Sequence, residues 1–414
     1  MKKKLFNILV IPFLGVNLYA LDLDEAIDTA LKNNNSLKRQ AYVLDEAKEN
    51  VNYSKASYQP TLNLSYEYNA NKESIQNSGK DNSSASAIIS YNLFNGLKDF
   101  YAVNSSKFLE ENSFFTYEAS KNDLIYDTKV YYINYLKSLK NIETQENAYK
   151  LLQQQYRDSK NRFDQGLLAK NDLLQVNAQM LQAKQALASA KANSKIARFE
   201  LKNILGGKLD TQEPIEDLAK RKIVMDQYSM DYLENRSEIK ALKSSIESMV
   251  SLKKSNRGNY MPSVDLNLAY TKFGDNGKLD VVEPAVDEQQ SAIVTMSWNL
   301  YNGGRDYSQD LIYQKRILQY KEQLEELKLS INLQYERAVE QFDVSELNYE
   351  TAKISLAQSK ENYKIVNNRF KEGLSTSTDL INANYLLSQA KQSFDNAYYD
   401  RFLAKASLDR VFEK

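Results

Sequence analysis

Four segments of the chain alternate apolar and polar residues with a period of two, which predicts β-strands. The segments are 61–68, 84–93, 264–270 and 292–300, and a polar loop from Asn71 to Ser84 separates the first two. Strands of about ten residues with this alternation are typical of outer-membrane barrels. A soluble antiparallel sheet with one wetted face has the same pattern, so the alternation alone does not decide between them.

Helical patterns follow each pair of strands, from about Lys98 to Phe163 and from about Arg305 to Phe370. A helix of about 65 residues is a rod of roughly 100 Å that needs partners along its length. In the second stretch, two sets of residues recur every seven positions, one mostly small and one mostly large, which predicts a coiled coil. The sets are Leu324, Ile331, Ala338, Ser345, Ala352, Ser359 and Val366, and Tyr335, Phe342, Tyr349, Leu356, Tyr363 and Phe370.

The chain contains this order of elements twice. Residues 89–96 (Ile-Ser-Tyr-Asn-Leu-Phe-Asn-Gly) return as residues 296–303 (Met-Ser-Trp-Asn-Leu-Tyr-Asn-Gly). Residues 162–167 (Arg-Phe-Asp-Gln-Gly-Leu) return as residues 369–374 (Arg-Phe-Lys-Glu-Gly-Leu), with the same offset of about 207 residues. Each half is predicted to hold two strands, a very long helix, a glycine turn and a returning helix. A repeat of this length indicates a duplicated half-domain rather than a solenoid unit.

The N-terminus has the features of a secretory signal peptide. Lysines at residues 2–4 precede an apolar run over residues 5–18, and Ala20 supplies a small residue for cleavage. The run is shorter than the roughly 20 residues needed to span a bilayer, and Asn7 and Pro12 interrupt it. We therefore expect an exported protein without a transmembrane anchor.

Composition excludes most catalytic chemistry. The 414 residues include no cysteine and no histidine, which removes thiol nucleophiles, disulfides, the usual zinc sites and histidine bases. The 54 basic and 54 acidic residues balance, so the chain has no positive field to attract nucleic acid. No phosphate-binding loop or metal-ligand spacing occurs, and we expect no catalytic residue, no cofactor and no metal.

Four membrane strands cannot form a closed barrel within one chain. Both edges of the sheet would expose unpaired N–H and C=O groups to lipid, at a cost of several kcal/mol each. Two chains would supply eight strands and three would supply twelve. A barrel of about eight strands is largely filled by its own side chains, while a larger one leaves a lumen. The polar inner face favours the larger barrel, and hence a trimer.

Together, the signal peptide, the duplicated order of elements, the Asn-Gly strand ends (Asn95-Gly96 and Asn302-Gly303) and the Arg-Phe-x-x-Gly-Leu turns resemble the TolC family of outer-membrane efflux proteins. The resemblance covers essentially the whole mature chain. It implies a mainly α-helical fold with membrane β-strands: a trimer whose twelve-stranded outer-membrane β-barrel is continued by a long α-helical barrel through the periplasm. It also implies an export duct without catalysis of its own, which works with a periplasmic adaptor (a membrane fusion protein) and an inner-membrane pump driven by protons or by ATP.

The resemblance assigns a place to each segment of the chain. The expected segments are a signal peptide (1–20), N-terminal periplasmic helices (21–58), barrel strands one and two (59–97), the first long helical hairpin (98–205), an equatorial linker (206–230), the helix of the second repeat (231–258), barrel strands three and four (259–303), and the second long hairpin with the C-terminal equatorial end (304–414).

The two glycine turns correspond to the hairpin ends at which the family's adaptor docks. Glycine suits a tight reversal with positive φ, and the leucine beside it offers an apolar contact. Alternatively, the Gly-Leu pair only makes the turn and covers the end of the hairpin. The candidate docking residues are Gln165, Gly166 and Leu167, and Glu372, Gly373 and Leu374.

The resemblance also implies a gate at the periplasmic end. Asp379 matches a pore-facing position, where threefold symmetry makes a carboxylate ring whose members raise each other's pKa and attract cations. The family's second ring position is Asn382 here. Asp172 matches a residue that latches the hairpins shut with a tyrosine and an arginine, but those positions are Phe370 and Ser375 in this chain, which leaves closure by packing. Alternatively, both aspartates only stabilise the first turn of a helix through its dipole.

An exported coiled-coil structural or scaffold protein is the alternative function. It explains the helices and the signal peptide, but not the paired amphipathic strands at matching places in both halves. Within the channel hypothesis the sequence does not specify the cargo, so drugs, toxic small molecules and secreted proteins all stay open.

Overall fold

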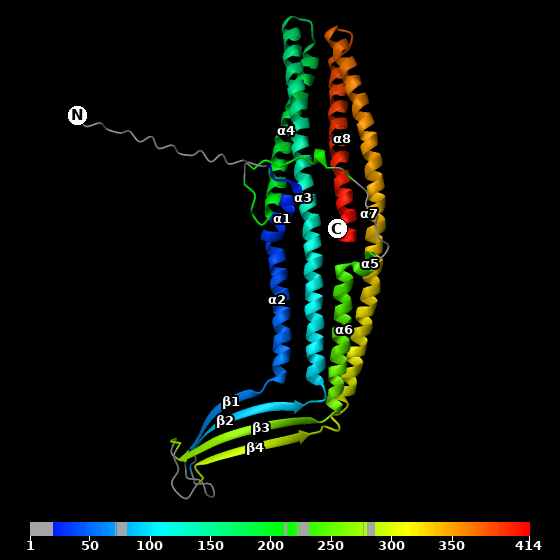
Figure 1. The fold of residues 1–414 in the computed structure, drawn as a ribbon. Coiled ribbons are helices and arrows are strands. Elements are labelled where there is room, and N and C mark those ends of the chain that lie inside the picture. Colours follow the sequence, from blue (N-terminus) through cyan, green and yellow to red (C-terminus); the bar gives the residue numbers. More distant parts are fainter. Residues whose placement is uncertain are drawn as a thin grey trace, which may run out of the picture. The chain divides into compact units, whose positions relative to one another are not determined.

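The computed structural model describes residues 20–70, 72, 81–210, 213–221, 223, 232–275, 277–279 and 286–414. The predicted signal peptide lies outside these residues, apart from Ala20. Both halves contain two strands, a helix of 67 residues, a turn and a shorter helix, as the sequence predicts (Figure 1). The elements are α1 (Leu23–Asn33), α2 (Asn35–Lys55), β1 (Thr61–Ala70), β2 (Asp81–Phe94), α3 (Lys98–Asp164), α4 (Lys170–Ile204), α5 (Tyr232–Asn235), α6 (Ser237–Arg257), β3 (Ser263–Asp275), β4 (Glu288–Ser297), α7 (Arg305–Lys371) and α8 (Ser377–Phe412).

The chain divides into two compact units, and each of the two long helices contributes to both of them. The first, which we call the hairpin unit, comprises residues 1–35, 121–227 and 335–414. The second, which we call the sheet unit, comprises residues 36–120 and 228–334. The hairpin unit therefore holds both glycine turns, and the sheet unit holds all four strands.

The sheet unit contains one antiparallel sheet with the strand order β1-β2-β3-β4 (Figure 1). Its register places apolar residues of neighbouring strands opposite each other. A slip of one residue would move the apolar side chains of a strand to the polar face, so the apolar pattern specifies this register. The alternation predicted from the sequence is thereby confirmed. One such apolar row consists of Leu62, Ile89, Leu268 and Ala292.

Several strand ends differ from the sequence prediction, since β1 runs to Ala70, β3 runs to Asp275 and β4 already begins at Glu288. β2 begins at Asp81, although the polar composition predicts a loop as far as Ser84. This polar start pairs with β1 and β3 on both sides, and the Ser83 hydroxyl donates to a carbonyl oxygen of the β3–β4 connection at 2.8 Å. β4 ends at Ser297, three residues before its predicted end, because it pairs there with Ser263, the first residue of β3.

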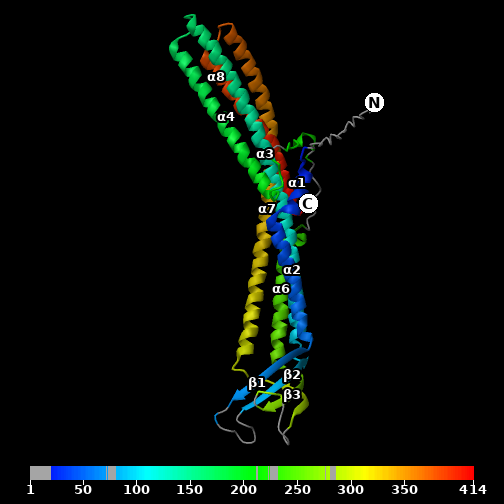
Figure 2. The same ribbon diagram turned by 90° about the vertical axis from the view of Figure 1, so that its left-hand side faces the viewer.

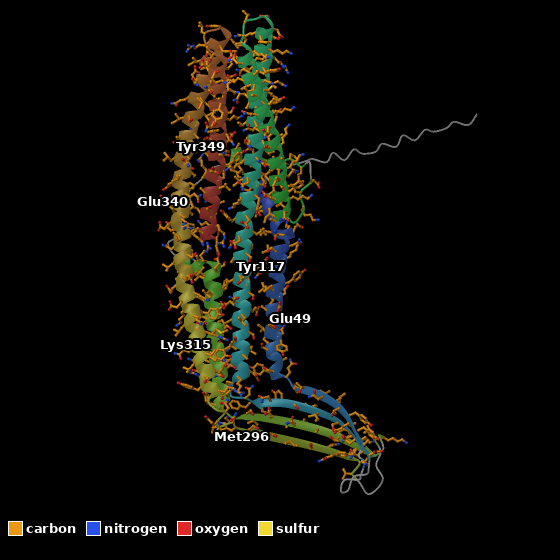
Figure 3. The ribbon with its side chains drawn as sticks, turned by 180° about the vertical axis from the view of Figure 1, so that it is seen from behind. Glu49, Tyr117, Met296, Lys315, Glu340 and Tyr349 are labelled. Carbon is orange, nitrogen blue, oxygen red and sulfur yellow. The ribbon has the colours of Figure 1, made fainter. Side chains whose placement is uncertain are left out.

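The two faces of the sheet differ in chemistry. On the polar face, side chains bond across neighbouring strands, and the Ser90 hydroxyl donates to Oδ1 of Asn267 at 2.7 Å. On the apolar face, large side chains are open, and Leu64 is 77% exposed and Met296 65% exposed. Met296 on β4 is labelled in Figure 3. Exposed apolar rows of this extent mark a surface that is covered by a partner or by lipid.

The helices of the hairpin unit pack in the predicted coiled-coil register. Members of both heptad sets of α7 are buried, namely Ala338, Ser345, Phe342, Leu356 and Phe370. The ring of Tyr349 lies 5.7 Å from that of Phe394 and 6.1 Å from that of Tyr398, both on α8. Figure 2 shows that the two hairpins, α3 with α4 and α7 with α8, turn at the same end of the unit. Among the described residues, no helix is long and apolar enough to cross a bilayer.

The start of the described chain is joined to the segment between the two halves. Leu21 forms a parallel bridge with Ile215. The buried hydroxyl of Tyr132 on α3 lies 2.9 Å from the carbonyl oxygen of Leu21 and 2.7 Å from that of Glu216. Burial raises the pKa of Tyr132, so this hydroxyl stays protonated and can donate to them. Both segments are thereby fixed against α3.

Candidate functional site at the hairpin turns

The two hairpin turns have the same backbone structure. A glycine just after each long helix has a positive φ, 74° at Gly166 and 76° at Gly373. The amide of the following leucine donates at 2.8 Å to the carbonyl oxygen five residues back, Arg162 in the first turn and Arg369 in the second. This hydrogen-bond pattern is a Schellman helix end. The reversal of chain direction that the sequence predicts is therefore present in both halves of the chain.

The turn residues are open to solvent. Leu167 is 72% exposed and Leu374 64% exposed, and Gln165 and Glu372 are exposed as well. Both leucines are therefore accessible to a partner. No other atom lies within 4 Å of a Cβ built on either turn glycine, so glycine is required for its φ and not for close packing.

Asp379 caps the start of α8. Its Oδ2 accepts hydrogen bonds from the backbone N–H of Thr376 at 2.9 Å and from the Thr376 hydroxyl at 2.7 Å. In return, the Asp379 N–H donates to the Thr376 hydroxyl oxygen at 3.1 Å, which completes a capping box. The backbone hydrogen bond from Thr376, followed by the hydroxyl bonds, lowers the pKa of Asp379. The carboxylate is thus both exposed and charged.

The other gate candidates lie in different surroundings. Asn382, three residues after Asp379, lies on the same face of α8, and both are exposed. Asp172 has the equivalent place in α4, but the cap residue there is Ala169, which has no side-chain oxygen. Asp172 is half-buried and accepts a hydrogen bond from the side chain of Asn171 at 3.0 Å. The duplicated aspartates are therefore not equivalent.

A cation–π contact joins the hairpins at the predicted latch position. Phe370 is buried at 7% exposure, and Cζ of Arg162 on α3 lies 4.8 Å from the centre of its ring. Ser375, the second latch position, donates its hydroxyl to Asp379 at 3.1 Å. Phe370 departs from the family pattern already in the sequence, but no pattern in the sequence marks Arg162 as its partner.

A second contact and a cleft lie close to this pair. The side-chain amide of Gln155 on α3 donates to the carbonyl oxygen of Ser377 on α8 at 3.3 Å. A cleft of about 490 Å³ is lined by residues that include Gln155, Arg162, Tyr363 and Phe370. An apolar cluster of Leu152, Val176, Ala183 and Ile381 also joins the two hairpins near this level.

The arrangement offers surfaces for binding and gating rather than a reaction centre. Within the part of the chain that the structure describes, no group of three or more acidic, histidine or cysteine side chains is placed to hold a metal ion. The exposed leucines, the charged helix start and the contact between hairpins can bind a partner, attract ions and hold helices together. None of these is a nucleophile with an adjacent base.

Solved structures share this fold over most of their length. The Campylobacter jejuni CmeC outer membrane channel matches with a TM-score of 0.82 and 19% identity, over 94% of this chain and 85% of that one. The open state of the Neisseria gonorrhoeae MtrE outer membrane channel matches with a TM-score of 0.80 and 18% identity, over 94% and 88%. A membrane protein from Pseudomonas aeruginosa matches with a TM-score of 0.84 and 16% identity, over 94% and 93%. The fold is thus that of an outer-membrane channel subunit.

The family is established by the sequence. The profile of the family described as outer membrane efflux protein matches residues 26–207 and 229–412, and the chain belongs to this family. A sequence search of curated proteins found no match. The TolC-like resemblance and the duplicated, mainly helical fold are confirmed, as is the function of a non-enzymatic efflux channel of tripartite export systems. The channel lies in the outer membrane, with a long helical portion in the periplasm.

Proposed function

We propose that three copies of this chain form one duct, with a twelve-stranded β-barrel in the outer membrane and an α-helical barrel below it. The duct receives drugs, toxic small molecules or secreted proteins from a pump and an adaptor and releases them outside the cell. The observation that carries the proposal is the four-stranded sheet, which has two open edges and an exposed apolar face.

The sheet requires other copies for closure. Its edge strands, β1 and β4, have unpaired backbone groups that lipid cannot satisfy. When β4 of one copy pairs with β1 of the next, three copies close a barrel of twelve strands, three times the four in each chain. The apolar rows then face lipid, and the hydrogen-bonded polar face lines a lumen wide enough for water.

This closure assigns each segment of the chain to a part of the duct. Residues 59–97 and 259–303 supply the barrel, and the paired helices over 98–205 and 304–414 form the periplasmic wall. Residues 21–58 and 231–258 extend that wall beside the long helices. The linker over 206–230, which lies partly outside the described residues, is assigned to an equatorial band. The contact of Tyr132 with Leu21 and Glu216 supports this last assignment, because it ties the linker to α3.

The partners dock at the hairpin turns. Leu167 and Leu374 are exposed apolar side chains at the ends of long rods, and three copies present six such ends on one rim. A periplasmic adaptor that covers these leucines removes apolar surface from water. The adaptor in turn connects the duct to an inner-membrane pump, driven by protons or by ATP, which determines the cargo.

Asp379 supplies a negative ring at the periplasmic entrance. The hydrogen bonds that lower its pKa keep the carboxylate charged through the neutral range, and its charge is lost only when the pH falls through that lowered value. Replacing Asp379 by alanine should therefore raise single-channel conductance in planar bilayers and weaken cation selectivity. Asp379→Asn keeps a hydrogen-bond acceptor for the cap and should lose selectivity in the same way. Currents unchanged in both variants would refute the ring.

The proposed function is tested by isolating the protein from the membrane. We expect a heat-modifiable trimer in the outer-membrane fraction, with conductance in planar bilayers after reconstitution. A folded monomer released with the soluble periplasmic proteins would contradict the duct and support the structural or scaffold protein instead. The neighbouring genes provide an independent check, because an adjacent adaptor with a proton-driven or ATP-driven transporter would identify the type of pump.

A further inference from the structure

The contact between α3 and α8, which joins the two hairpins, holds a cluster of charged side chains. Nζ of Lys391 on α8 lies 2.7 Å from Oε1 of Glu143 on α3. Nζ of Lys140 on α3 lies 3.3 Å from Oδ2 of Asp217 in the linker. Asp395 is one turn of α8 after Lys391, and the charges of both lysines act on its carboxyl group. We call these residues the charge cluster; they are Lys140, Glu143, Asp217, Lys391 and Asp395, all within the hairpin unit.

The charge cluster has one carboxylate more than it has cations. Its two lysines face three carboxylates, and two of these carboxylates are engaged. The hydrogen bond from Lys391 lowers the pKa of Glu143. Asp217 accepts a hydrogen bond from the Tyr399 hydroxyl at 3.0 Å, in addition to its ion pair. In the described part of the chain, Oδ2 of Asp395 has no hydrogen-bond partner and the side chain has no ion pair. Asp395 is therefore the unmatched charge.

Burial makes this unmatched charge costly. Asp395 is half-buried, and its Oδ2 is closed off from solvent. Burial raises the pKa of Asp395 and repulsion from Glu143 adds to the rise, while the two lysines oppose it without cancelling it. Among the described residues, the charges that act on this carboxyl group come from α3 and from α8 itself. The charged form is thus disfavoured while α3 and α8 are in contact.

A proton on Asp395 balances the charge cluster. Two lysines then face two carboxylates. The protonated carboxyl group is also a hydrogen-bond donor. Its neighbour on α3 is Thr144, whose hydroxyl oxygen is buried and has no hydrogen-bond partner among the described residues. One proton therefore removes a buried charge and supplies a donor at the contact between the hairpins, where an unpaired polar group is costly.

We propose that Asp395 is a proton-binding site between the hairpins, and that its protonation strengthens the contact of α3 with α8. The unmatched, buried carboxylate at this contact carries the proposal. In the duct, a stronger contact keeps the hairpins together, so acid should favour the closed state. This effect on gating rests on the proposed function, whereas the proton-binding site itself does not.

The direction of the pH effect follows from the raised pKa of Asp395. Separation of the hairpins exposes the carboxyl group to water, where its pKa returns toward the ordinary value of about 3.9. The joined state therefore binds the proton more tightly. Its added strength is complete below the ordinary value and is lost as the pH rises through the raised one. Between the two values, each pH unit changes the ratio of joined to separated hairpins by at most about tenfold in each copy.

Infrared titration of the folded protein tests the site directly. Above the ordinary range of aspartic acids, Asp395→Asn should reduce the carboxylic acid band by the contribution of one group per chain. The loss is the readout rather than the band itself, because burial also raises the pKa of Asp127. The matched control is Asp400→Asn, since Asp400 also joins α8 to α3 but lies 2.7 Å from Nζ of Lys137. This control should keep the full band, and an unchanged band in Asp395→Asn would overturn the proposal.

A change at Glu143 tests the charge balance independently. Glu143→Gln deprives Lys391 of its carboxylate partner on α3. Asp395 follows Lys391 by four residues, which is a spacing for an ion pair within a helix. The carboxylate should therefore take over this lysine, and the contribution of Asp395 to the band should vanish without any change at residue 395. A band of full size in Glu143→Gln would contradict the charge balance on which the proposal depends.

Conductance in planar bilayers tests the consequence for gating. An Asp379→Asn background removes the carboxylate beside the second turn as a source of pH dependence. In this background the open fraction should fall several-fold as the pH decreases toward about 4. Adding Asp395→Asn should keep the open fraction low and constant, because asparagine is neutral like the protonated acid. Adding Asp400→Asn should leave the pH dependence in place.

The outcomes distinguish this inference from the proposed function. A protein that forms no trimer or conducts no ions would contradict the proposed function, while the infrared loss at Asp395 would still establish the proton-binding site. An infrared loss together with an unchanged pH dependence of conductance in Asp395→Asn would overturn the effect on gating.

Discussion

Replacing Leu167 and Leu374 together by glutamate should abolish export while trimeric channel stays in the outer membrane. Both leucines are exposed at the hairpin turns, so their replacement leaves the fold intact. In a docked complex, however, each glutamate would be buried without a partner. With each leucine a hot spot worth about 2 kcal/mol, the adaptor affinity falls by up to about a thousandfold for the two. Accumulation of a dye substrate in intact cells measures the loss.

The control for this experiment keeps the apolar character of the turns. Leu167→Met with Leu374→Met should export normally, because methionine fills a similar volume. Conductance of the purified double-glutamate channel should also equal that of the wild type. Normal export by the glutamate variant would show that the adaptor does not rely on these leucines, and docking would have to be sought elsewhere.

Removing the guanidinium of Arg162 should open the periplasmic end. Arg162 contacts the ring of Phe370, which lies at the latch position predicted from the sequence. A shielded cation–π contact stabilises the joined hairpins by about 1–2 kcal/mol, so its loss shifts the balance between closed and open states by roughly five- to thirty-fold in each copy. Arg162→Ala should therefore raise the time-averaged conductance several-fold in planar bilayers.

Two further variants distinguish this contact from simple loss of packing. Phe370→Tyr keeps an aromatic face under Arg162, so conductance should stay low. Phe370→Leu keeps much of the apolar volume but removes the ring, and it should behave like Arg162→Ala. A low conductance in both Phe370→Leu and Arg162→Ala would mean that other contacts hold the hairpins, of which the bond from Gln155 to Ser377 is the nearest.

Much of the fold follows from local patterns in the sequence. The alternation in each strand and the heptad sets of α7 depend only on which face of an element is apolar, and both are confirmed. Strand ends depend on the partner strand as well. β2 begins at Asp81 although its first residues are polar, because β1 and β3 extend far enough to pair with them. No pattern within residues 81–84 contains that information.

The sequence indicates one feature of the candidate site, the cap formed by Asp379, but not the other, the contact between Arg162 and Phe370. Thr376 precedes Asp379 by three residues, which is the spacing of a capping box, so the low pKa of this carboxyl has a local signal. The contact of Arg162 with Phe370 joins residues 208 positions apart on two helices. It depends on how the hairpins meet side by side, and a single sequence does not specify this.

The polar face of the sheet has a consequence for transport itself. Its groups are engaged with each other: Asn92 donates to Asp265 at 2.6 Å, and the hydroxyls of Ser86 and Thr271 lie 3.0 Å apart. A wall whose donors and acceptors are already satisfied adheres weakly to whatever slides past it. Low friction of this kind would let chemically unlike molecules leave through the same passage, with selection made before they enter.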